Sequence, residues 1–526
     1  MLVSIICWAL TVLGCLMGTR YYVHMLQLES YQLDGYMRWI KARGAHPVLI
    51  NSCIGVGFAV MNICITALVR SHVPAVQGGA KVSVTAVFAL VAFLMMRSWA
   101  AQSQKKPLAF TPRVKRLYWY LGGVCALLGA VLELLNVGCF MYSLVPMIVW
   151  AGAYAAQPGE QRINHSFFVD AQKKLAERPD LIKIGITGSY GKTSTKFVLK
   201  TLLEEKYNVL ATPSSFNTPM GVTRIVREQL RPEHQIFIGE MGARHVGDIK
   251  EMCELVHPSI GILTSIGPQH LETFGSIENV ANTKNELVEA LPADGIAFFA
   301  ADGGWLDKLY ARAACEKYRA GLTRDKMYMR AEDISVGPDG STFTLVCEDG
   351  GRIRCTTRLL GKHNVQNIVL SAAVAHKLGV SMDQLAAGIG KIEPIEHRLQ
   401  LIPGAGGKVV IDDAFNSNPA GAARAMEVLA SFEGLRCVVT PGMVELGERE
   451  EELNREFGRQ MAKACDAAIL LGKKRAQPIR EGMIEVGFTE QNIFVVDSLD
   501  AAMPILAALN ADVTLFENDL PDNYTE

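Results

Sequence analysis

The sequence lacks an excess of charge of either sign. Its 52 Lys and Arg residues nearly balance 53 Asp and Glu residues, for a formal net charge of −1. Nucleic-acid-binding chains usually carry a clear basic excess, so we expect no nucleic-acid partner. The sequence also lacks any C-x-x-C pair among its 12 cysteines. We therefore expect buried thiols in a reducing compartment, without disulfides or a cysteine metal site.

Charge is also scarce in long stretches of the N-terminal third. Five nearly uncharged apolar runs occur there, at residues 1–17, 47–69, 82–96, 117–135 and 137–156. A helix needs about 20 apolar residues to cross a bilayer; the first, second and fifth runs approach that length, and the other two are shorter. Because several runs follow the first, a signal peptide is not favoured. We expect an α-helical membrane domain of about five spans over 1–156.

Basic residues predict the orientation of these spans. They cluster between the first and second spans and between the third and fourth, whereas the segment between the second and third holds only Arg70 and Lys81. Because positively charged loops face the cytoplasm, we expect a multi-pass protein of the cell membrane with a cytoplasmic C-terminal part. Glu133 and Asn136 lie in or beside the fourth span. They belong either to a loop or to a polar functional site within the membrane.

A glycine-rich segment follows this apolar third. It reads TGSYGKTS, between an apolar strand expected over 181–187 and a helix expected over 196–205. Glycines let backbone N–H groups close on phosphate oxygens, Lys192 can reach the β- and γ-phosphates, and the Thr193 hydroxyl can bind Mg²⁺. Because this spacing is shorter than G-x-x-x-x-G-K-[ST], an ordinary β–α turn is the alternative. The residues expected to bind a nucleotide are Thr187, Gly188, Ser189, Tyr190, Gly191, Lys192, Thr193 and Ser194.

The remaining chain alternates strand-like and helical stretches. After a polar linker at 157–180, this alternation predicts an α/β domain with a mainly parallel sheet over 181–394. Within it, short alternating strands and a turn at 337–340 predict a small antiparallel insert. A second alternation, with strands expected at 409–411, 436–440, 467–471, 493–496 and 513–516, predicts a third domain at 395–526. The length of 526 residues agrees with about three or four domains.

Further motifs follow the glycine-rich loop in order. They are SFNTPMG at 215–221, GEMGARH at 239–245, TSIGPQHLETFG at 264–275, NTKNE at 282–286, GKHNVQN at 361–367 and IDDAFNSNP at 411–419. With the loop, this set resembles the Mur ligase family of ATP-dependent amide ligases in peptidoglycan precursor synthesis, and most closely its D-alanyl-D-alanine-adding members. The resemblance implies a P-loop central domain and a Rossmann-like C-terminal domain.

The resemblance also implies a reaction. A carboxylate attacks the γ-phosphate of ATP, and an amine then displaces phosphate from the acyl phosphate to form an amide. Catalysis of phosphoryl transfer is mostly positioning and charge neutralisation. Two Mg²⁺ sites are implied, with Thr193 at the first, His270 at the second, and Glu240 and a carbamylated Lys284 as further ligands. Without the resemblance, Glu240 is a solvent-facing strand end, His270 a structural residue and Lys284 a solvated helix charge.

The nucleotide would be selected between the two α/β domains. The resemblance places Asn364 and Asn367 beside the adenine, where side-chain amides can pair with ring edges. It places Asp413 at the ribose and Asn217 within the same nucleotide site.

Two features flank the start of the third domain. Arg398 belongs to a Glu-His-Arg segment that resembles the hinge of the family, and it would meet phosphate as the domains close. Asn416 and Asn418 follow the same strand as Asp413. They either join the nucleotide site or only form the turn.

The sequence departs from the family in two places. Apolar spans stand where the family keeps its UDP-binding domain, which favours a lipid-linked muropeptide acceptor over a soluble muropeptide. Asn454 stands where relatives often have His, and the segment 515–524 lacks their basic, glycine-containing ending. The incoming amine, an amino acid or a dipeptide such as D-Ala-D-Ala, therefore stays open.

Three other functions remain open from the sequence. A membrane ligase that extends an amide polymer such as poly-glutamate shares the nucleotide loop, but not the motifs at 239–245 and 264–275. A transport component driven by ATP hydrolysis agrees with the spans and the loop, but not with the implied metal ligands. A non-catalytic scaffold is not favoured, because every phosphate and metal position is retained.

Overall fold

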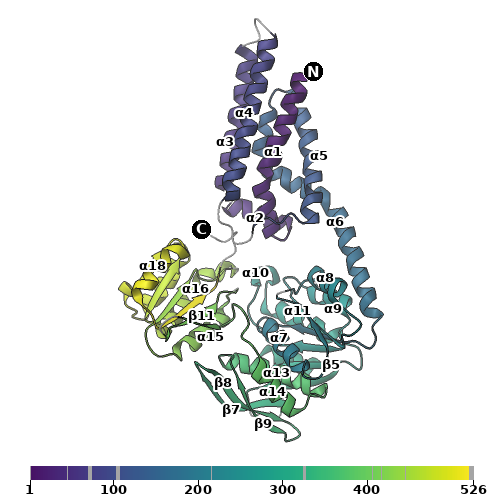
Figure 1. Ribbon diagram of the computed structural model, residues 1–526, viewed down its shortest axis with the longest axis vertical. Coiled ribbons are helices and arrows are strands. Elements are labelled where there is room, and N and C mark those ends of the chain that lie inside the picture. Colours follow the sequence, from purple (N-terminus) through teal and green to yellow (C-terminus); the bar gives the residue numbers. More distant parts are fainter. Residues whose placement is uncertain are drawn as a thin grey trace. The chain divides into compact units, whose positions relative to one another are not determined.

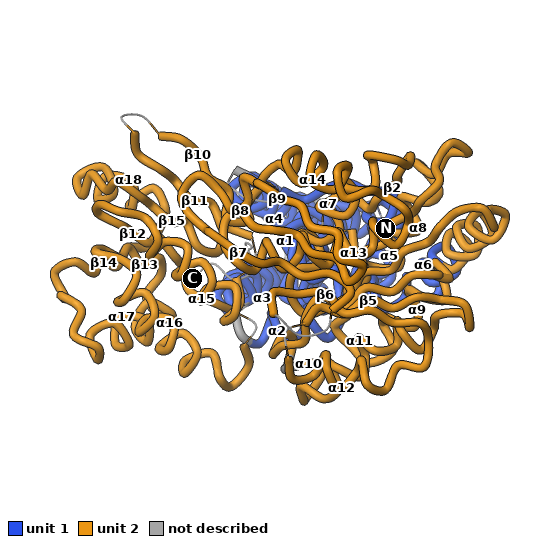
Figure 2. Tube along the Cα trace, turned by 90° about the horizontal axis from the view of Figure 1, so that it is seen from below, with its two compact units in different colours: residues 1–164, 521–525 blue, residues 165–520, 526 orange. Residues whose placement is uncertain are grey.

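The protein forms two compact units, which divide between Asn164 and His165 (Figures 1 and 2). The computed structural model describes residues 2–43, 45–68, 74–101, 107–214, 216–301, 303–323, 327–404, 407–415, 417–444 and 446–519. Asn416, one of the two asparagines with two interpretations, lies outside the described residues.

The first unit is built from helices. They are α1 (Leu2–Leu28), α2 (Leu33–Arg43), α3 (Ala45–Leu68), α4 (Pro74–Ala101), α5 (Pro112–Leu134), the 3₁₀ helix η1 (Gly138–Leu144) and α6 (Val145–Ala176). Within the part of the chain that the structure describes, five helical segments are long and apolar enough to cross a membrane, the same number as the sequence predicts. The stretch expected to be a linker begins inside α6, because its polar residues continue the helix without a break.

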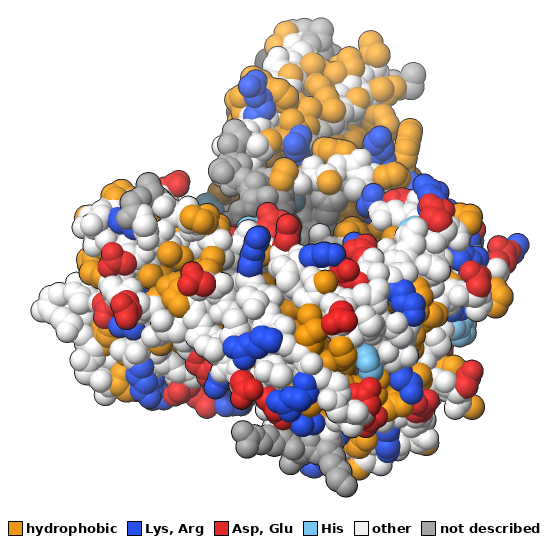
Figure 3. Space-filling model, turned by 60° about the horizontal axis from the view of Figure 1, so that its bottom comes forward, with side chains coloured by type: hydrophobic (Ala, Val, Ile, Leu, Met, Phe, Trp, Pro, Cys, Tyr) orange, Lys and Arg blue, Asp and Glu red, His pale blue; other side chains and the backbone are white. Residues whose placement is uncertain are grey.

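The first unit exposes apolar side chains and buries polar ones. Figure 3 shows many hydrophobic side chains on its surface, and Leu49, Leu90, Trp119 and Leu127 are among those exposed. Soluble proteins rarely expose large apolar patches, so this surface is suited to a bilayer. Inside the unit, the buried Asn51 amide donates to the Tyr22 hydroxyl at 3.3 Å.

Glu133 and Asn136 belong to a polar cluster of the first unit. With Asn62 and Lys81, they line a small cavity. The Lys81 ammonium donates to the side chain of Asn136. The side-chain oxygen of Asn62 is buried and has no hydrogen-bond partner among the described residues. Glu133 lies in the last turn of α5 and Asn136 in the turn after it, so the loop interpretation fits Asn136, and a polar functional site within the membrane stays a prediction.

The second unit contains a nine-stranded sheet with the order β2-β3-β1-β4-β5-β6-β7-β8-β9. Its strands are β1 (Ile182–Thr187), β2 (Val209–Ala211), β3 (Ile236–Glu240), β4 (Ile260–Leu263), β5 (Ile296–Ala301), β6 (Glu316–Gly321), β7 (Met329–Gly337), β8 (Gly340–Cys347) and β9 (Arg352–Thr357). The pairs from β2 to β7 are parallel, and β7, β8 and β9 are antiparallel. The expected antiparallel insert is therefore an extension of the main sheet, with its turn where the sequence predicts it.

Buried aliphatic residues explain why this sheet is parallel. β3 and β4 are buried along their whole length. Strands buried on both faces are typical of parallel sheets covered by helices. The helices of this part are α7 (Lys192–Leu203), α8 (Pro219–Gln229), α9 (Asp248–Val256), α10 (Leu271–Phe274), α11 (Ile277–Glu289), α12 (Trp305–Arg312), α13 (Lys362–Lys377) and α14 (Met382–Lys391).

A six-stranded sheet follows, with the order β10-β11-β15-β12-β13-β14. Its strands are β10 (Gln400–Pro403), β11 (Val409–Asp413), β12 (Arg436–Thr440), β13 (Ala467–Leu471), β14 (Ile493–Val496) and β15 (Val513–Glu517). The sequence predicts the five parallel strands but not the short antiparallel β10, which forms an edge. The helices of this part are α15 (Pro419–Ala430), η3 (Gly447–Arg449), α16 (Glu450–Ala464), α17 (Ala476–Glu485), η4 (Glu490–Asn492) and α18 (Leu499–Leu509).

Candidate active site

The glycine-rich loop joins the end of β1 to the start of α7. Gly191, the residue before α7, has a φ of 81°, which favours glycine. A Cβ atom there would lie 2.8 Å from the side-chain oxygen of Asn367. Thr193 and Ser194 are buried in the first turn of α7. The loop therefore directs the N-terminus of α7 outward from the carboxyl edge of the sheet. The free backbone N–H groups at a helix N-terminus can bind an anion.

A second segment, after β4, fixes this loop in place. The backbone N–H groups of Ser189 and Tyr190 donate to the backbone oxygen and the hydroxyl of Ser265, both at 2.8 Å. The Ser189 hydroxyl donates to the Gly267 carbonyl at 3.0 Å, and the Tyr190 hydroxyl donates to the Pro268 carbonyl at 3.1 Å. The loop is thus held in one conformation before any ligand binds, which lowers the entropic cost of binding.

Glu240 lies at the end of β3, in the middle of a polar network. Its carboxylate accepts hydrogen bonds from the Thr193 hydroxyl at 3.1 Å and from the Asn217 amide at 3.2 Å. It also forms an ion pair with Lys196 at 2.9 Å, where the two side chains are only 1% and 0% exposed. The interpretation of Glu240 as a solvent-facing residue is therefore wrong, because parallel strands bury the end of β3.

Lys196 is a residue of this network that the motif analysis missed. It lies four residues after Lys192 in α7, so both side chains share one face of the helix. This four-residue spacing from Lys192 is the feature of the sequence that could have identified Lys196. Because a charge buried in a protein is costly unless it is paired, Lys196 and Glu240 stabilise each other's charged forms.

Burial and neighbouring charges shift the pKa values of this network. Burial lowers the pKa of Lys192 to about 8; Glu240 opposes that shift, and Arg398 adds to it. Burial alone would raise the pKa of Glu240, but Lys196 and Lys192 outweigh it and hold the pKa below its ordinary value. The site thus keeps a carboxylate next to two lysines.

Two residues of the last α/β part act on the same network. The guanidinium of Arg398 lies 4.9 Å from the centre of the Phe415 ring. Burial lowers the pKa of Arg398, although the negative charges of Glu240 and Asp413 act to raise it. Asp413 ends β11, and its carboxylate accepts the Leu399 N–H at 3.2 Å. Burial raises the pKa of Asp413 to about 6.

The chain matches two domain families that occur together. Residues 186–375 match the Mur ligase middle domain, and residues 397–516 match the Mur ligase, glutamate ligase domain. A UDP-N-acetylmuramoyl-tripeptide–D-alanyl-D-alanine ligase of Mycobacterium leprae is 32% identical over 355 residues, which cover 62% of this chain and 68% of that protein.

The chain belongs to the Mur ligase family.

Other relatives agree with this assignment. The enzyme with the same name from Escherichia coli is 31% identical over 294 residues, which cover 55% of this chain and 64% of that protein. The chain thus spans less than two thirds of that relative. A crystal structure of MurF from Acinetobacter baumannii aligns with a TM-score of 0.63 at 25% identity, and covers 69% of this chain and 78% of the other.

The donors around Glu240 fit the Mg²⁺ that the Mur ligase resemblance implies. A carboxylate and a hydroxyl are hard oxygen ligands, the kind that Mg²⁺ prefers, and Glu240 and Thr193 supply one each within 3.1 Å of each other. Both belong to the residues that the sequence predicts as ligands.

Lys284 of α11 is buried rather than solvated. Its side chain is 2% exposed, so its interpretation as a solvated helix charge is wrong. Burial, with a further contribution from Lys192, places the pKa of Lys284 well below its ordinary value.

The other predicted ligands have different surroundings. His270 has a left-handed backbone, with a φ of 51°, directly before α10. Asn364 donates its amide to the Leu360 carbonyl at 2.8 Å, and Asn367 accepts from the Thr195 hydroxyl at 3.5 Å. Asn418 caps α15 by accepting the Gly421 N–H at 2.9 Å, which favours the turn interpretation for that residue. Metal or adenine binding by His270, Asn364 and Asn367 stays a prediction.

The described residues at the two departures from the Mur ligase pattern include the buried Asn454 and Glu517. The Asn454 side chain accepts the Met443 N–H at 2.9 Å and donates to the Met443 carbonyl at 3.0 Å, so it fixes the loop after β12. Glu517 ends β15, beside Asp413 in the sheet. Its carboxyl accepts the Thr440 hydroxyl at 3.2 Å, and burial raises its pKa to about 8.

Proposed function

We propose that this Mur ligase is an ATP-dependent enzyme that forms a carbon–nitrogen bond through an acyl phosphate. The observation that carries the proposal is the convergence of Lys192, Thr193 and Glu240 at the carboxyl edge of the parallel sheet. These groups can bind phosphate and a divalent cation and neutralise the charge that develops as the γ-phosphoryl group is transferred. Arg398 is an additional cation for that charge.

In this proposal the remaining site residues have separate roles. ATP binds to the loop residues, with Asn217 nearby, Asn364 and Asn367 at the adenine and Asp413 at the ribose. His270 and a carbamylated Lys284 hold the second Mg²⁺. Carbamylation requires a neutral amine to react with CO₂, and burial beside Lys192 favours that form of Lys284.

The acceptor in this proposal is a muropeptide carboxylate. The apolar helices of the first unit favour a lipid-linked muropeptide at the cytoplasmic surface of the cell membrane. The amine is D-Ala-D-Ala or a similar amino acid or dipeptide.

A product assay tests this proposal. Membranes that contain the protein are supplied with ATP, Mg²⁺ and a panel of D-amino acids and dipeptides, and lipid-linked and UDP-linked muropeptides are compared as acceptors. Phosphate release and product mass are measured. We expect release that requires both acceptor and amine, with a product that gains the mass of one amine less water. Acceptor-independent release would contradict the proposal in favour of transport, and no release in any combination would favour a scaffold.

The pKa of Lys192 gives a second expectation. Because this pKa lies at about 8, Lys192 carries its charge below that pH and loses it above. Binding of ATP to the neutral form must take up a proton, so the Kd for ATP should rise as pH increases above about 8, approaching about tenfold per pH unit. Equilibrium binding across that pH range measures it. A Kd that stays constant up to pH 10 would contradict the shifted pKa.

A further inference from the structure

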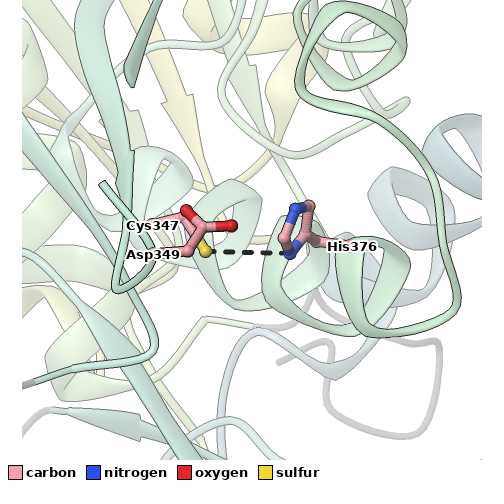
Figure 4. Close-up of side chains that lie close together, drawn as sticks. All are labelled: Cys347, Asp349 and His376. Atoms are coloured by element: carbon pink, nitrogen blue, oxygen red, sulfur yellow. Dashed lines mark hydrogen bonds between the residues drawn. The ribbon is translucent and has the colours of Figure 1, made fainter. Parts of the chain in front are cut away.

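A cluster of metal-binding side chains lies apart from the residues of the proposed ligase site (Figure 4). Cys347 is the last residue of β8, and Asp349 lies in the turn that joins β8 to β9. His376 belongs to the last turn of α13. Tyr328 directly precedes β7. Three segments that are separate in sequence thus bring a thiol, a carboxylate, an imidazole and a phenol together.

The distance between two groups of this cluster matches that between two ligands of one metal ion. The sulfur of Cys347 lies 3.7 Å from Nδ1 of His376. One ligand atom from each of Cys347, Asp349 and His376 lies within 4.8 Å of the others. In a tetrahedral Zn²⁺ site, Zn–S and Zn–N bonds of about 2.3 and 2.1 Å place sulfur and nitrogen about 3.6 Å apart. An ion can therefore bind between Cys347 and His376 without a movement of the backbone.

The other groups leave room for a complete set of four ligands. The Tyr328 hydroxyl lies 2.8 Å from Nδ1 of His376. Its oxygen can turn to the ion as a fourth ligand, or a water can take that place. Asp349 accepts the Gly351 N–H at 2.9 Å through one carboxylate oxygen, which fixes the turn and leaves the second oxygen for the metal. Cys347 is 2% exposed, whereas Asp349 is exposed, so an ion has a path from solvent to a shielded thiol.

We propose that Cys347, Asp349, His376 and either Tyr328 or a water form a binding site for a divalent transition-metal ion of the Zn²⁺ type. A thiolate with an imidazole and a carboxylate suits a borderline-soft ion, whereas Mg²⁺ and Ca²⁺ prefer oxygen ligands alone. Binding forms the metal–sulfur bond and releases the thiol proton to solvent. The absence of C-x-x-C made such a site unexpected, because these ligands come from separate elements.

The site would join two parts of the nine-stranded domain. Its ligands connect the antiparallel edge, β7 to β9, to the C-terminal end of α13. The N-terminal end of the same helix carries Asn364 and Asn367, and Asn367 contacts the glycine-rich loop. A metal in this position would restrain the helix that supports the loop, and its binding does not depend on the proposed ligase activity.

Metal binding by the full chain in detergent tests this proposal. The purified protein is stripped with a chelator, dialysed against Zn²⁺ or Co²⁺, and analysed for bound metal and for the visible absorption spectrum. We expect one tightly held ion per chain and a thiolate-to-Co²⁺ charge-transfer band. In the Asp349→Asn variant, the amide oxygen can still accept the Gly351 N–H while the charge is lost, so folding is retained and the Kd for Zn²⁺ rises by at least about tenfold.

Two further variants make the test specific. His376→Gln should remove both the bound ion and the charge-transfer band. Cys355→Ser is the matched control, because Cys355 is buried in the adjacent strand β9 and lies outside the cluster; this variant should bind metal like the original protein. Absence of a thiolate band in the original protein, or equal metal content in all three variants, would overturn the proposal and leave a hydrogen-bonded cluster or an adventitious ion only.

Discussion

Replacing Lys192 with alanine is expected to abolish ATP turnover. Lys192 is the first residue of α7, and its ammonium donates to the carbonyl oxygens of Gly188 at 2.6 Å and Ser189 at 3.2 Å. It therefore lies across the loop that we propose to bind the phosphates. Negative charge develops on the phosphoryl group as it is transferred, and the alanine variant lacks the cation that would stabilise this charge. Phosphate release should therefore fall by about 10²–10³-fold.

A neighbouring lysine provides the control for this result. Lys200 lies in the same helix but forms a solvent-accessible ion pair with Glu204 at 2.6 Å. Lys200→Ala should keep turnover near the original level, because exposed pairs of this kind contribute little. Full phosphate release from Lys192→Ala would contradict the assignment of the loop to ATP, whereas loss in both variants would indicate a folding defect of α7.

Replacing Lys284 with alanine should abolish amide formation while ATP still binds. If Lys284 is carbamylated, it supplies an anion for the second Mg²⁺, and alanine removes that ligand. We expect amide formation to fall by at least about 10²-fold. The loop and Glu240 remain, so equilibrium binding of ATP should be preserved. Bicarbonate or a small carboxylic acid should partly restore amide formation, because a carboxylate can occupy the space that the side chain leaves.

Two measurements separate the carbamate from a structural role of Lys284. The original protein, incubated with isotope-labelled bicarbonate, should show a carbamate signal that the Lys284→Ala variant lacks. Lys308→Ala is the matched control, because that lysine is exposed on α12. Full amide formation by Lys284→Ala would exclude the carbamate role, and loss without any rescue and without ATP binding would indicate local unfolding instead.

Some of the fold follows from the sequence because its signals are local. A strand–loop–helix with TGSYGKTS forms as predicted, since glycine conformation and apolar periodicity act over a few residues, but the helix begins at Lys192 rather than at the expected residue 196. The five parallel strands of the last sheet follow from the same alternation. The edge strand β10 does not, because four residues carry too little pattern to distinguish a strand from a loop.

Other parts of the site depend on contacts between distant segments. Lys196 appears as an ordinary helix lysine until β3 brings Glu240 to 2.9 Å from it. In the sequence, Asn454 is only a position where relatives often have His. In the structure, its side-chain amide forms hydrogen bonds with the backbone N–H and carbonyl of Met443. For the same reason the sequence did not predict the proposed metal site, since its ligands Cys347 and His376 lie 29 residues apart in the chain.

The sequence by itself determined the glycine-rich loop, the order of the motifs, the alternation of strands and helices and the number of apolar spans, because these depend on neighbouring residues. Only the tertiary structure decided which charges are buried, which of them are paired and how their pKa values shift. Those properties depend on the packing of segments far apart in the chain, where burial removes water and makes each neighbouring charge more effective.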